Sequence, residues 1–295
     1  MFITKYFKLA GYSSSIAILL LVVADGAHAS KYGSEAGINY LSTATTLSDQ
    51  HFRRAQLSAD YTVNFAPTFV SGPVTQHAYS QKVSQLTIKT DHVISSSNDE
   101  ESSVSGNALS LNLYPPGHSY YFQVDYADNT INASSRQQRL KQTSLGMGFF
   151  TSGKFSYGVR ASDANTGSFT DIDQIYQYAG RARGVFVKNI VRSLQNTYLM
   201  YTFSLSTGRF DLSNTLALDY RQGSTEFALY PNKSEEWALS YTQYRIEDEP
   251  EKRDESLLSY TNYISKNNGL IVKLKRDQSY NSELRSISLG WKIRI

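Results

Sequence analysis

Charged side chains recur at every second position in several segments of this chain, between residues that are apolar. In residues 286–295 the apolar positions are Ile287, Leu289, Trp291, Ile293 and Ile295, and the positions between them carry serine, glycine, lysine and arginine. A period of two is typical of a strand with one apolar and one water-facing side. Rings of charged side chains that line a channel can discriminate between cations and anions. The charged face is therefore the first candidate site.

If the apolar faces contact lipid, the alternate residues face a lumen. The charged residues that this register predicts along a pore are Arg54, Asp60, Lys89, Asp91, Asp125, Arg160, Arg181, Arg183, Asp219, Lys273, Lys275, Lys292 and Arg294, joined by Lys154, Arg221, Asp211, Glu226 and Glu236. Cations outnumber anions in this set, which predicts a mild preference for anions. The alternative is that the charges pair across the barrel and set no preference. A shift of one residue in any strand exchanges its two faces.

Small residues share the predicted inner face and would leave room for water. They are Ser58, Thr62, Ser110, Ser144, Gly146, Ser156, Gly158, Ser213, Ala217, Ser288 and Gly290. A narrow, plugged barrel would instead fill its lumen with bulky side chains. The pattern therefore favours an open pore.

Catalytic chemistry finds little support in the sequence. His51 and His92 have Asp49 and Asp91 close in sequence, and His118 precedes Ser119, but no residue set combines a nucleophile with a positioned base. No spacing of metal ligands and no glycine-rich phosphate loop is present. We expect no enzymatic activity, no metal and no cofactor.

The composition indicates an exported protein. Residues 1–29 carry Lys5 and Lys8, an apolar run at 16–24 and alanines at 27 and 29, which is the pattern of a secretory signal peptide. Residues 30–295 are then predicted to form one domain. The whole chain has no cysteine, is rich in tyrosine (22) and phenylalanine (14), and has a mean hydropathy of −0.39. The net charge of +3 gives no support for nucleic-acid binding.

Alternating segments fill the predicted domain, and no helical period is sustained. Counting them yields about fifteen strands, whereas a closed single-chain bacterial barrel needs an even number. Residues 175–188 either form two strands, or a short segment such as 226–230 is not a strand. The fold class predicted is all-β: a single transmembrane antiparallel up-and-down β-barrel of about 14–16 strands. Residues 66–81 are irregular, as a long connection or as a segment folded against the barrel end.

The closing segment resembles the C-terminal assembly signal of bacterial outer-membrane barrels, with Ser288, Gly290, Ile293 and Ile295 at its characteristic positions. The chain as a whole resembles the putative general porins of proteobacteria. That resemblance implies an outer-membrane location and a water-filled channel for passive diffusion of small hydrophilic solutes. It also implies contact with outer-membrane lipid and lipopolysaccharide, recognition by the barrel-assembly machinery, and a monomer or homotrimer. The alternative is a structural or adhesive barrel that acts through its loops.

The resemblance further predicts which turns face which side of the membrane. Residues 98–101 and 248–255 are expected outside the cell, and residues 115–117 and 267–269 in the periplasm. General porins fold one loop into the pore, and by length the candidates are residues 95–106 and 162–173. We also expect Lys292→Glu to leave assembly intact, because the side chain should face water.

Overall fold

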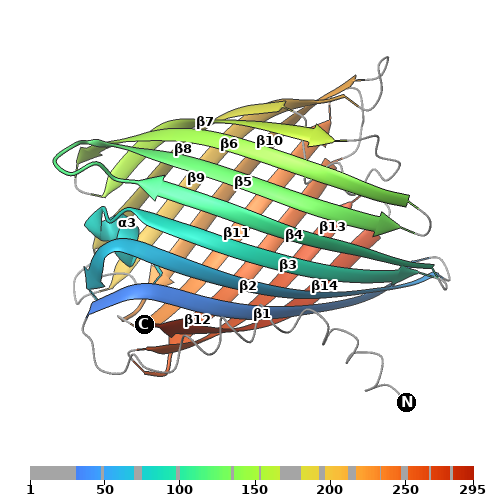
Figure 1. Cartoon of the computed structure of the whole chain (residues 1–295), viewed down its shortest axis with the longest axis horizontal. Helices are drawn as coiled ribbons and strands as arrows, with labels where there is room; N and C mark the ends of the chain where they lie inside the picture. Colours follow the sequence, from blue (N-terminus) through green and yellow to red (C-terminus); the bar gives the residue numbers. More distant parts are fainter. Residues whose placement is uncertain are drawn as a thin grey trace.

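The computed structural model describes most of the chain after residue 30. The described residues are 31–47, 50–69, 75–97, 100–133, 136–152, 154–166, 181–192, 197–211, 217–232, 234–246, 252–265, 267–279 and 282–295. The predicted signal peptide, residues 1–29, lies outside them. Alternating side chains over these ranges form long strands joined by short connections (Figure 1).

The elements are fourteen strands and one short helix. They are β1 (Lys31–Leu47), β2 (Gln50–Phe69), α3 (His77–Gln81), β3 (Gln85–Ser97), β4 (Glu100–Leu113), β5 (Tyr120–Ala133), β6 (Arg136–Ser152), β7 (Phe155–Thr166), β8 (Arg181–Arg192), β9 (Tyr198–Asp211), β10 (Ala217–Tyr230), β11 (Glu235–Ile246), β12 (Lys252–Tyr263), β13 (Asn268–Ser279) and β14 (Ser282–Arg294).

Every strand pairs antiparallel with its neighbours in sequence, and β1 pairs with β14 to close the barrel. Along the closing seam Ile38 lies opposite Trp291, and Tyr40 lies opposite Leu289. Beyond β14, the backbone N–H and C=O of Ile295 bond to Ser34 and Gly33 at 2.8 Å. The seam therefore leaves no strand edge open. Figure 1 shows α3 and the C-terminus at the same end of the barrel.

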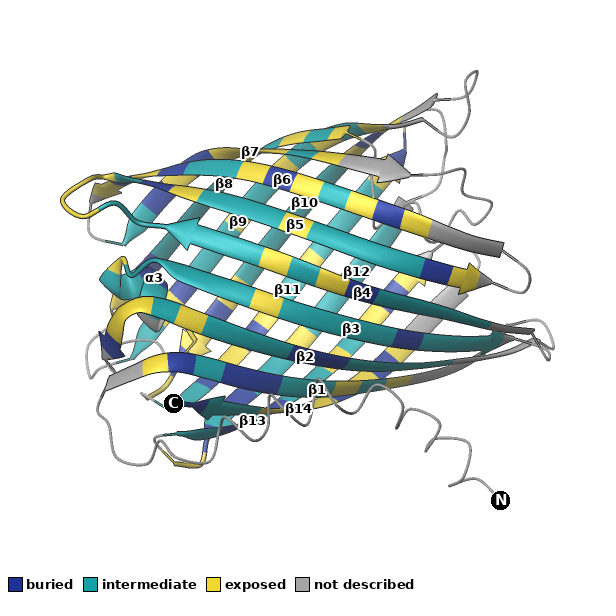
Figure 2. Ribbon diagram, in the orientation of Figure 1, coloured by how far each residue is buried: buried dark blue, intermediate teal, exposed yellow. Residues whose placement is uncertain are grey.

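Large apolar side chains on the outer face are exposed in strand after strand. The side chains of Leu145, Leu205 and Leu289 are 59%, 66% and 54% exposed. The residues on either side of each leucine in its strand are more buried (Figure 2). Aromatic rings near the strand ends, such as Tyr157 and Trp237, belong to the same outward set. A closed barrel with an apolar exterior and no free edge is the β-structure that a bilayer tolerates.

The barrel has fourteen strands, which is the lower of the two even numbers that the sequence allowed. Residues 226–230 are part of a longer strand, β10, which begins at Ala217. Residues 181–188 belong to a single strand, β8. Residues 95–106, expected as a loop, are mostly strand, because β3 and β4 extend with polar residues well past their apolar parts.

Gly290 shows why the assembly-signal position accepts no side chain. It faces inward opposite Asn39, and a Cβ at Gly290 would lie 1.9 Å from Asn39 Oδ1 and 3.1 Å from the carbonyl oxygen of Ile38. A side chain at Gly290 would force Asn39 out of its present position on the inner face of the seam.

Leu289→Arg should impair barrel assembly, because it moves a charge into the lipid-facing surface at a cost of roughly 2–4 kcal/mol at mid-bilayer depth. The measurement is heat-modifiable mobility on gels after folding into lipid vesicles, and Leu289→Phe is the matched control that keeps the face apolar. Equal folding yields for the two variants would show that residue 289 does not face lipid.

Candidate functional site

The connection between β2 and β3 enters the barrel. We call its described residues 75–84 the strap. Thr75 Oγ1 contacts Glu236 Oε2 on β11 and lies 3.3 Å from the Tyr230 hydroxyl on β10. Lys188 Nζ on β8 donates to Gln76 Oε1 at 2.7 Å. Since β8, β10 and β11 lie across the barrel from β2 and β3, the strap must traverse the lumen to reach them.

Helix α3 has only five residues and is closed by Lys82, whose backbone is left-handed (φ 54°). The N–H groups of Lys82 and Val83 bond back to the carbonyls of Tyr79 and Ala78 at 3.2 and 2.9 Å. A helix this short has little stability of its own in water. Its conformation therefore depends on contacts with the barrel wall.

Tyr79 supplies the main contact of α3. Its hydroxyl lies 2.7 Å from Ser156 Oγ and donates to the Lys154 carbonyl at 3.2 Å. Its ring packs edge-on against Tyr121, and Lys188 Nζ lies 4.2 Å from the ring centroid, a cation–π contact. Burial raises the pKa of Tyr79, so the hydroxyl remains a neutral donor at physiological pH.

Aromatic side chains surround the strap at this end of the lumen. Tyr114 stacks on Tyr121 with centroids 5.2 Å apart, and Phe150 lies 5.4 Å from Tyr79. Tyr121 reaches the cluster over Gly148, where a Cβ would lie 2.3 Å from its ring. The strap is thus anchored by apolar packing as well as by hydrogen bonds.

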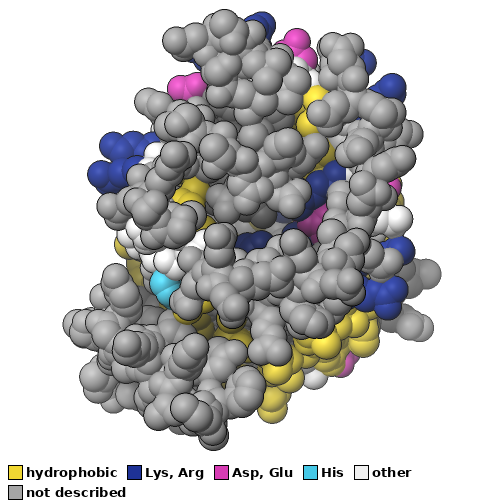
Figure 3. Space-filling model, turned by 90° about the vertical axis from the view of Figure 1, so that its right-hand side faces the viewer, with side chains coloured by type: hydrophobic (Ala, Val, Ile, Leu, Met, Phe, Trp, Pro, Cys, Tyr) yellow, Lys and Arg dark blue, Asp and Glu magenta, His cyan; other side chains and the backbone are white. Residues whose placement is uncertain are grey.

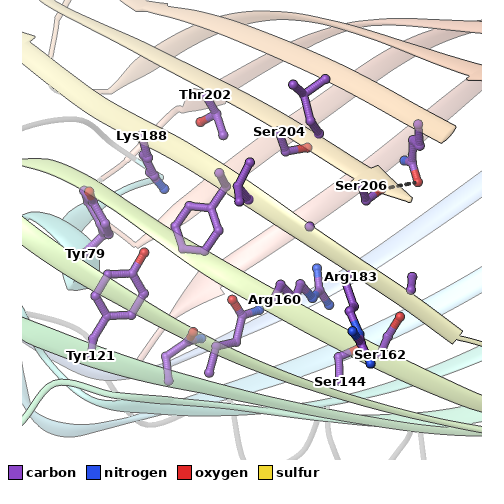
Figure 4. Close-up of a pocket in the computed structure, with 18 of the residues that line it drawn as sticks. Tyr79, Tyr121, Ser144, Arg160, Ser162, Arg183, Lys188, Thr202, Ser204 and Ser206 are labelled. Carbon is purple, nitrogen blue, oxygen red and sulfur yellow. Dashed lines mark hydrogen bonds between the residues drawn. The ribbon is translucent and has the colours of Figure 1, made fainter. Parts of the chain in front are cut away.

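A cavity of about 690 Å³ lies between the strap and the rest of the lumen. Small hydroxyl side chains on β9 form part of its wall, with Thr202, Ser204 and Ser206 in a row (Figure 4). Arg160 and Lys188 add positive charge, and Tyr79 and Tyr121 form its aromatic end (Figure 4). The cavity is polar and has the size of a small solute.

Solved structures share this architecture. Omp33, an outer membrane protein of Acinetobacter baumannii, superposes with a TM-score of 0.59 at 12% identity, over 91% of this chain and 100% of that chain. The chain has the fold of an outer-membrane β-barrel. The translocator domain of the autotransporter NalP from Neisseria meningitidis (TM-score 0.46, 8% identity, 98% of both chains) and an anion-selective porin from Comamonas acidovorans (0.42, 9%, 89% and 100%) are more distant. No protein-family model matches the sequence, and a comparison with curated proteins finds no match.

Most of the charged residues predicted for the lumen lie on the inner face of the outer-membrane barrel. These charged residues alternate with exposed apolar neighbours such as Ile88, Leu274 and Leu289. Because the apolar neighbours point outward, the charged residues point into the lumen. The inner-face residues are Arg54, Asp60, Lys89, Asp91, Asp125, Arg160, Lys273, Lys275, Lys292 and Arg294. Of the small residues, Ser213 and the side chain of Ala217 lie outside the described part.

Three predicted lumen residues, Arg181, Arg183 and Asp219, lie on the outer face instead. In β8, Lys188 faces the strap, so Arg181, Arg183 and the 55%-exposed Val185 point outward. Residues 185–187 are all apolar, so this stretch carries no alternation from which the side could be read.

In β10, Tyr220 points inward and is buried, which turns its neighbours Asp219 and Arg221 outward. The ring of Tyr220 packs over Gly208, where a Cβ would lie 2.2 Å from it. The predicted register, which placed Asp219 in the lumen and therefore Tyr220 toward lipid, is wrong at this position.

Ion pairs within one strand, or between strands one or two places apart, neutralise much of the inner charge. Asp125 accepts hydrogen bonds from Arg160 at 2.7 Å and from Ser110 at 2.5 Å. Lys89 pairs with Asp91, and Lys275 pairs with Glu255, both at 2.8 Å. Arg253 and Asp277 form a further pair. This arrangement favours the alternative in which paired charges set no strong ion preference.

Glu35 is the centre of the tightest charge cluster. It accepts from Lys292 Nζ at 2.8 Å, Arg294 Nε at 3.2 Å and the Tyr263 hydroxyl at 2.8 Å. The Arg294 guanidinium also stacks 3.6 Å from the Tyr263 ring centroid. Two predicted pore residues, Lys292 and Arg294, therefore join β1 to β14. Lys292→Glu would place two carboxylates together, so the expectation that it leaves assembly intact no longer follows from the geometry.

The histidines do not assemble a catalytic set in the described part of the chain. His92 and Asp91 lie on opposite faces of β3; His92 Nδ1 is 2.8 Å from Ser105 Oγ, and His118 stacks on Tyr120. Among the described residues, no group of three or more histidine, cysteine, aspartate and glutamate side chains could hold a metal ion. The same residues include no helix long and apolar enough to cross a membrane.

Glu35→Ala should destabilise the barrel by about 3–5 kcal/mol, because it leaves two buried cations without their carboxylate. The measurement is the temperature at which the folded band disappears on unboiled gels. The double variant Glu35→Gln/Lys292→Gln, which removes both charges, should recover part of the loss. A single variant as stable as the native chain would show that the cluster contributes nothing to closure.

Proposed function

We propose that this protein is an outer-membrane channel for passive diffusion of small hydrophilic solutes, with passage restricted at one end by the strap. The observation that carries the proposal is the polar cavity of about 690 Å³ on the inner face, bordered by serine, threonine, arginine and lysine side chains. A lumen built only for rigidity would be close-packed with side chains and would leave no cavity of this size.

The strap determines how such a channel would work. Its aromatic contacts occupy the end of the lumen at which the C-terminus lies, while the inner face farther along carries Ser144, Ser162, Ser204 and Ser206. Figure 3 looks onto the opposite end and shows charged side chains within the opening. Solutes would pass the strap only when the contacts of Thr75, Gln76 and Tyr79 rearrange.

The same strap supports the second candidate, a structural or adhesive barrel that acts through its loops. If the strap never leaves its contacts, the lumen stays closed, and the protein acts only through its exterior surface. Contact with the assembly machinery through Ser288, Gly290, Ile293 and Ile295, and the choice between monomer and homotrimer, stay predictions.

Single-channel recording in planar bilayers separates the two candidates. We expect the native protein to give small or brief conductance steps, and the variant Tyr79→Ala/Thr75→Ala to give larger and longer ones, because the strap loses its anchors on β7, β10 and β11. Ser80→Ala, on the same helix, is the matched control. If neither the native protein nor the anchor variant conducts at any voltage, the channel proposal fails.

A reversible cross-link tests the strap directly, since the native chain has no cysteine. Thr75→Cys/Glu236→Cys, joined by a short bifunctional methanethiosulfonate reagent, should hold the strap against β11 and lower conductance. A reducing agent should restore it. Conductance that neither the cross-linking reagent nor the reducing agent changes would show that the strap does not restrict passage.

The orientation is tested by labelling cysteines on intact cells. Short turns of bacterial barrels face the periplasm, so the end with α3 and the C-terminus should be periplasmic. Asn132→Cys, exposed at the opposite end of β5, should react with a membrane-impermeant maleimide, and His118→Cys should not. The reverse pattern would show an inverted barrel.

A further inference from the structure

Glycines leave part of the inner wall beside the cavity without side chains. Gly148 on β6 lies directly opposite Gly158 on β7. In the next row away from α3, Gly146 and Gly184 lie on either side of Arg160. Four glycines on three neighbouring strands therefore hollow the wall at one depth, and the cavity extends to the backbone at Gly184.

Two aromatic rings cover the first pair of glycines. Tyr121 extends from β5 over Gly148, where a Cβ would lie 2.3 Å from its ring, and Phe186 extends from β8 over Gly158, where a Cβ would lie 2.5 Å from Cζ. The centroids of the two rings are 6.4 Å apart, and both rings line the cavity. We call these two rings the aromatic floor. It gives an apolar surface to a cavity whose other walls are largely polar.

Uncharged polar side chains surround the aromatic floor. Ser206 Oγ on β9 lies 3.5 Å from Gln222 Oε1 on β10 (Figure 4). Gln142, Ser162 and Thr202 also line the cavity, and their side chains form no hydrogen bond within the described part of the chain. Hydroxyl and amide groups can each donate and accept hydrogen bonds. These groups are therefore available to a solute that carries hydroxyl groups of its own.

The cations that reach the cavity from the inner face already have partners. Arg160 pairs with Asp125 at 2.7 Å. Lys188 donates to Gln76 and lies over the ring of Tyr79. None of the described residues that line the cavity carries a carboxylate. An ammonium group on a solute would meet no counter-charge here, and a carboxylate would have to take a cation from its partner. An uncharged solute meets neither cost.

We propose that the cavity binds a neutral saccharide of one or two rings, with one sugar ring on the aromatic floor and its hydroxyl groups on the surrounding serine, threonine and glutamine side chains. The inference rests on the proposed channel function, since the sugar must enter the lumen. The C–H groups of a sugar ring pack against the negative face of an aromatic ring, and its hydroxyl groups both donate and accept. Ligand pockets commonly combine aromatic walls with a few polar groups that fix orientation.

Saturation-transfer NMR of the folded protein in detergent micelles, with maltose as the probe, tests the inference without any ion current. We expect saturable binding, and about tenfold weaker binding in Phe186→Ala, because the sugar loses one ring of the aromatic floor. Phe186→Tyr keeps the ring and should retain the binding. Leu257→Ala shortens an inward side chain on β12 outside the cavity, and as the matched control it should bind maltose as the native protein does.

A second variant tests the polar groups without creating a void. Thr202→Val keeps the shape of the side chain and removes its hydroxyl, so we expect about fivefold weaker maltose binding. Heat-modifiable mobility on gels checks that both variants are folded. Maltose binding that is unchanged in folded Phe186→Ala and in Thr202→Val would overturn the proposal.

Competition against bound maltose tests the class of solute. Glucose should compete, whereas sorbitol, which has the hydroxyl groups but no ring, should compete poorly. Equal competition by sorbitol would overturn the role of the aromatic floor, and stronger competition by glucose 6-phosphate than by glucose would point to anionic solutes instead. Planar-bilayer recording keeps the two proposals apart: conductance without maltose binding overturns this inference alone, and maltose binding without conductance overturns the channel proposal alone.

Discussion

The structure depends on one constraint: within a bilayer, every backbone N–H and C=O must find a partner in the protein. Fourteen antiparallel strands satisfy it only because β1 and β14 pair with each other. Gly290 allows the two strands to approach at Asn39, and the cluster of Glu35, Lys292 and Arg294 ties the seam together near its end. The residues that close the barrel are therefore also residues that would line its lumen.

The two ends of the lumen differ in chemistry. One end contains α3 and a cluster of aromatic side chains, whereas the rest of the inner face carries serine, threonine, glycine and paired charges. The strap is held by contacts with β7, β8, β10 and β11, and its five-residue helix has little stability apart from them. Restriction at one end and a hydrated interior are compatible in a channel whose strap can rearrange.

Charge is distributed differently on the two faces of the wall. Inside, Asp125, Asp91, Glu255 and Glu35 each pair with a cation on the same strand or on a strand one or two places away. Outside, arginines face arginines at the border of the apolar surface. The inner ion pairs join residues of the wall to one another and add rigidity.

The sequence by itself determined the all-β barrel, the side of most strands and the inward position of Asp60, Lys89, Asp125, Lys292 and their neighbours, because alternation with a period of two depends only on local order. It did not determine the side of Arg181, Arg183 and Asp219. There the apolar residues lie on both faces. The side is set by Lys188, which donates to Gln76 of the strap, and by Tyr220, whose ring packs inward over Gly208 on the neighbouring strand.

The path of the strap across the lumen could likewise not be predicted from the local sequence. From the sequence, residues 66–81 were expected to be an irregular connection, either long or folded against the barrel end. Residues 66–69 instead belong to β2. Only the closed barrel brings Thr75 to Glu236 and Tyr79 to Ser156, since these contacts join residues far apart in the chain. Local periodicity fixes which way a side chain points, and the tertiary structure decides what it meets there.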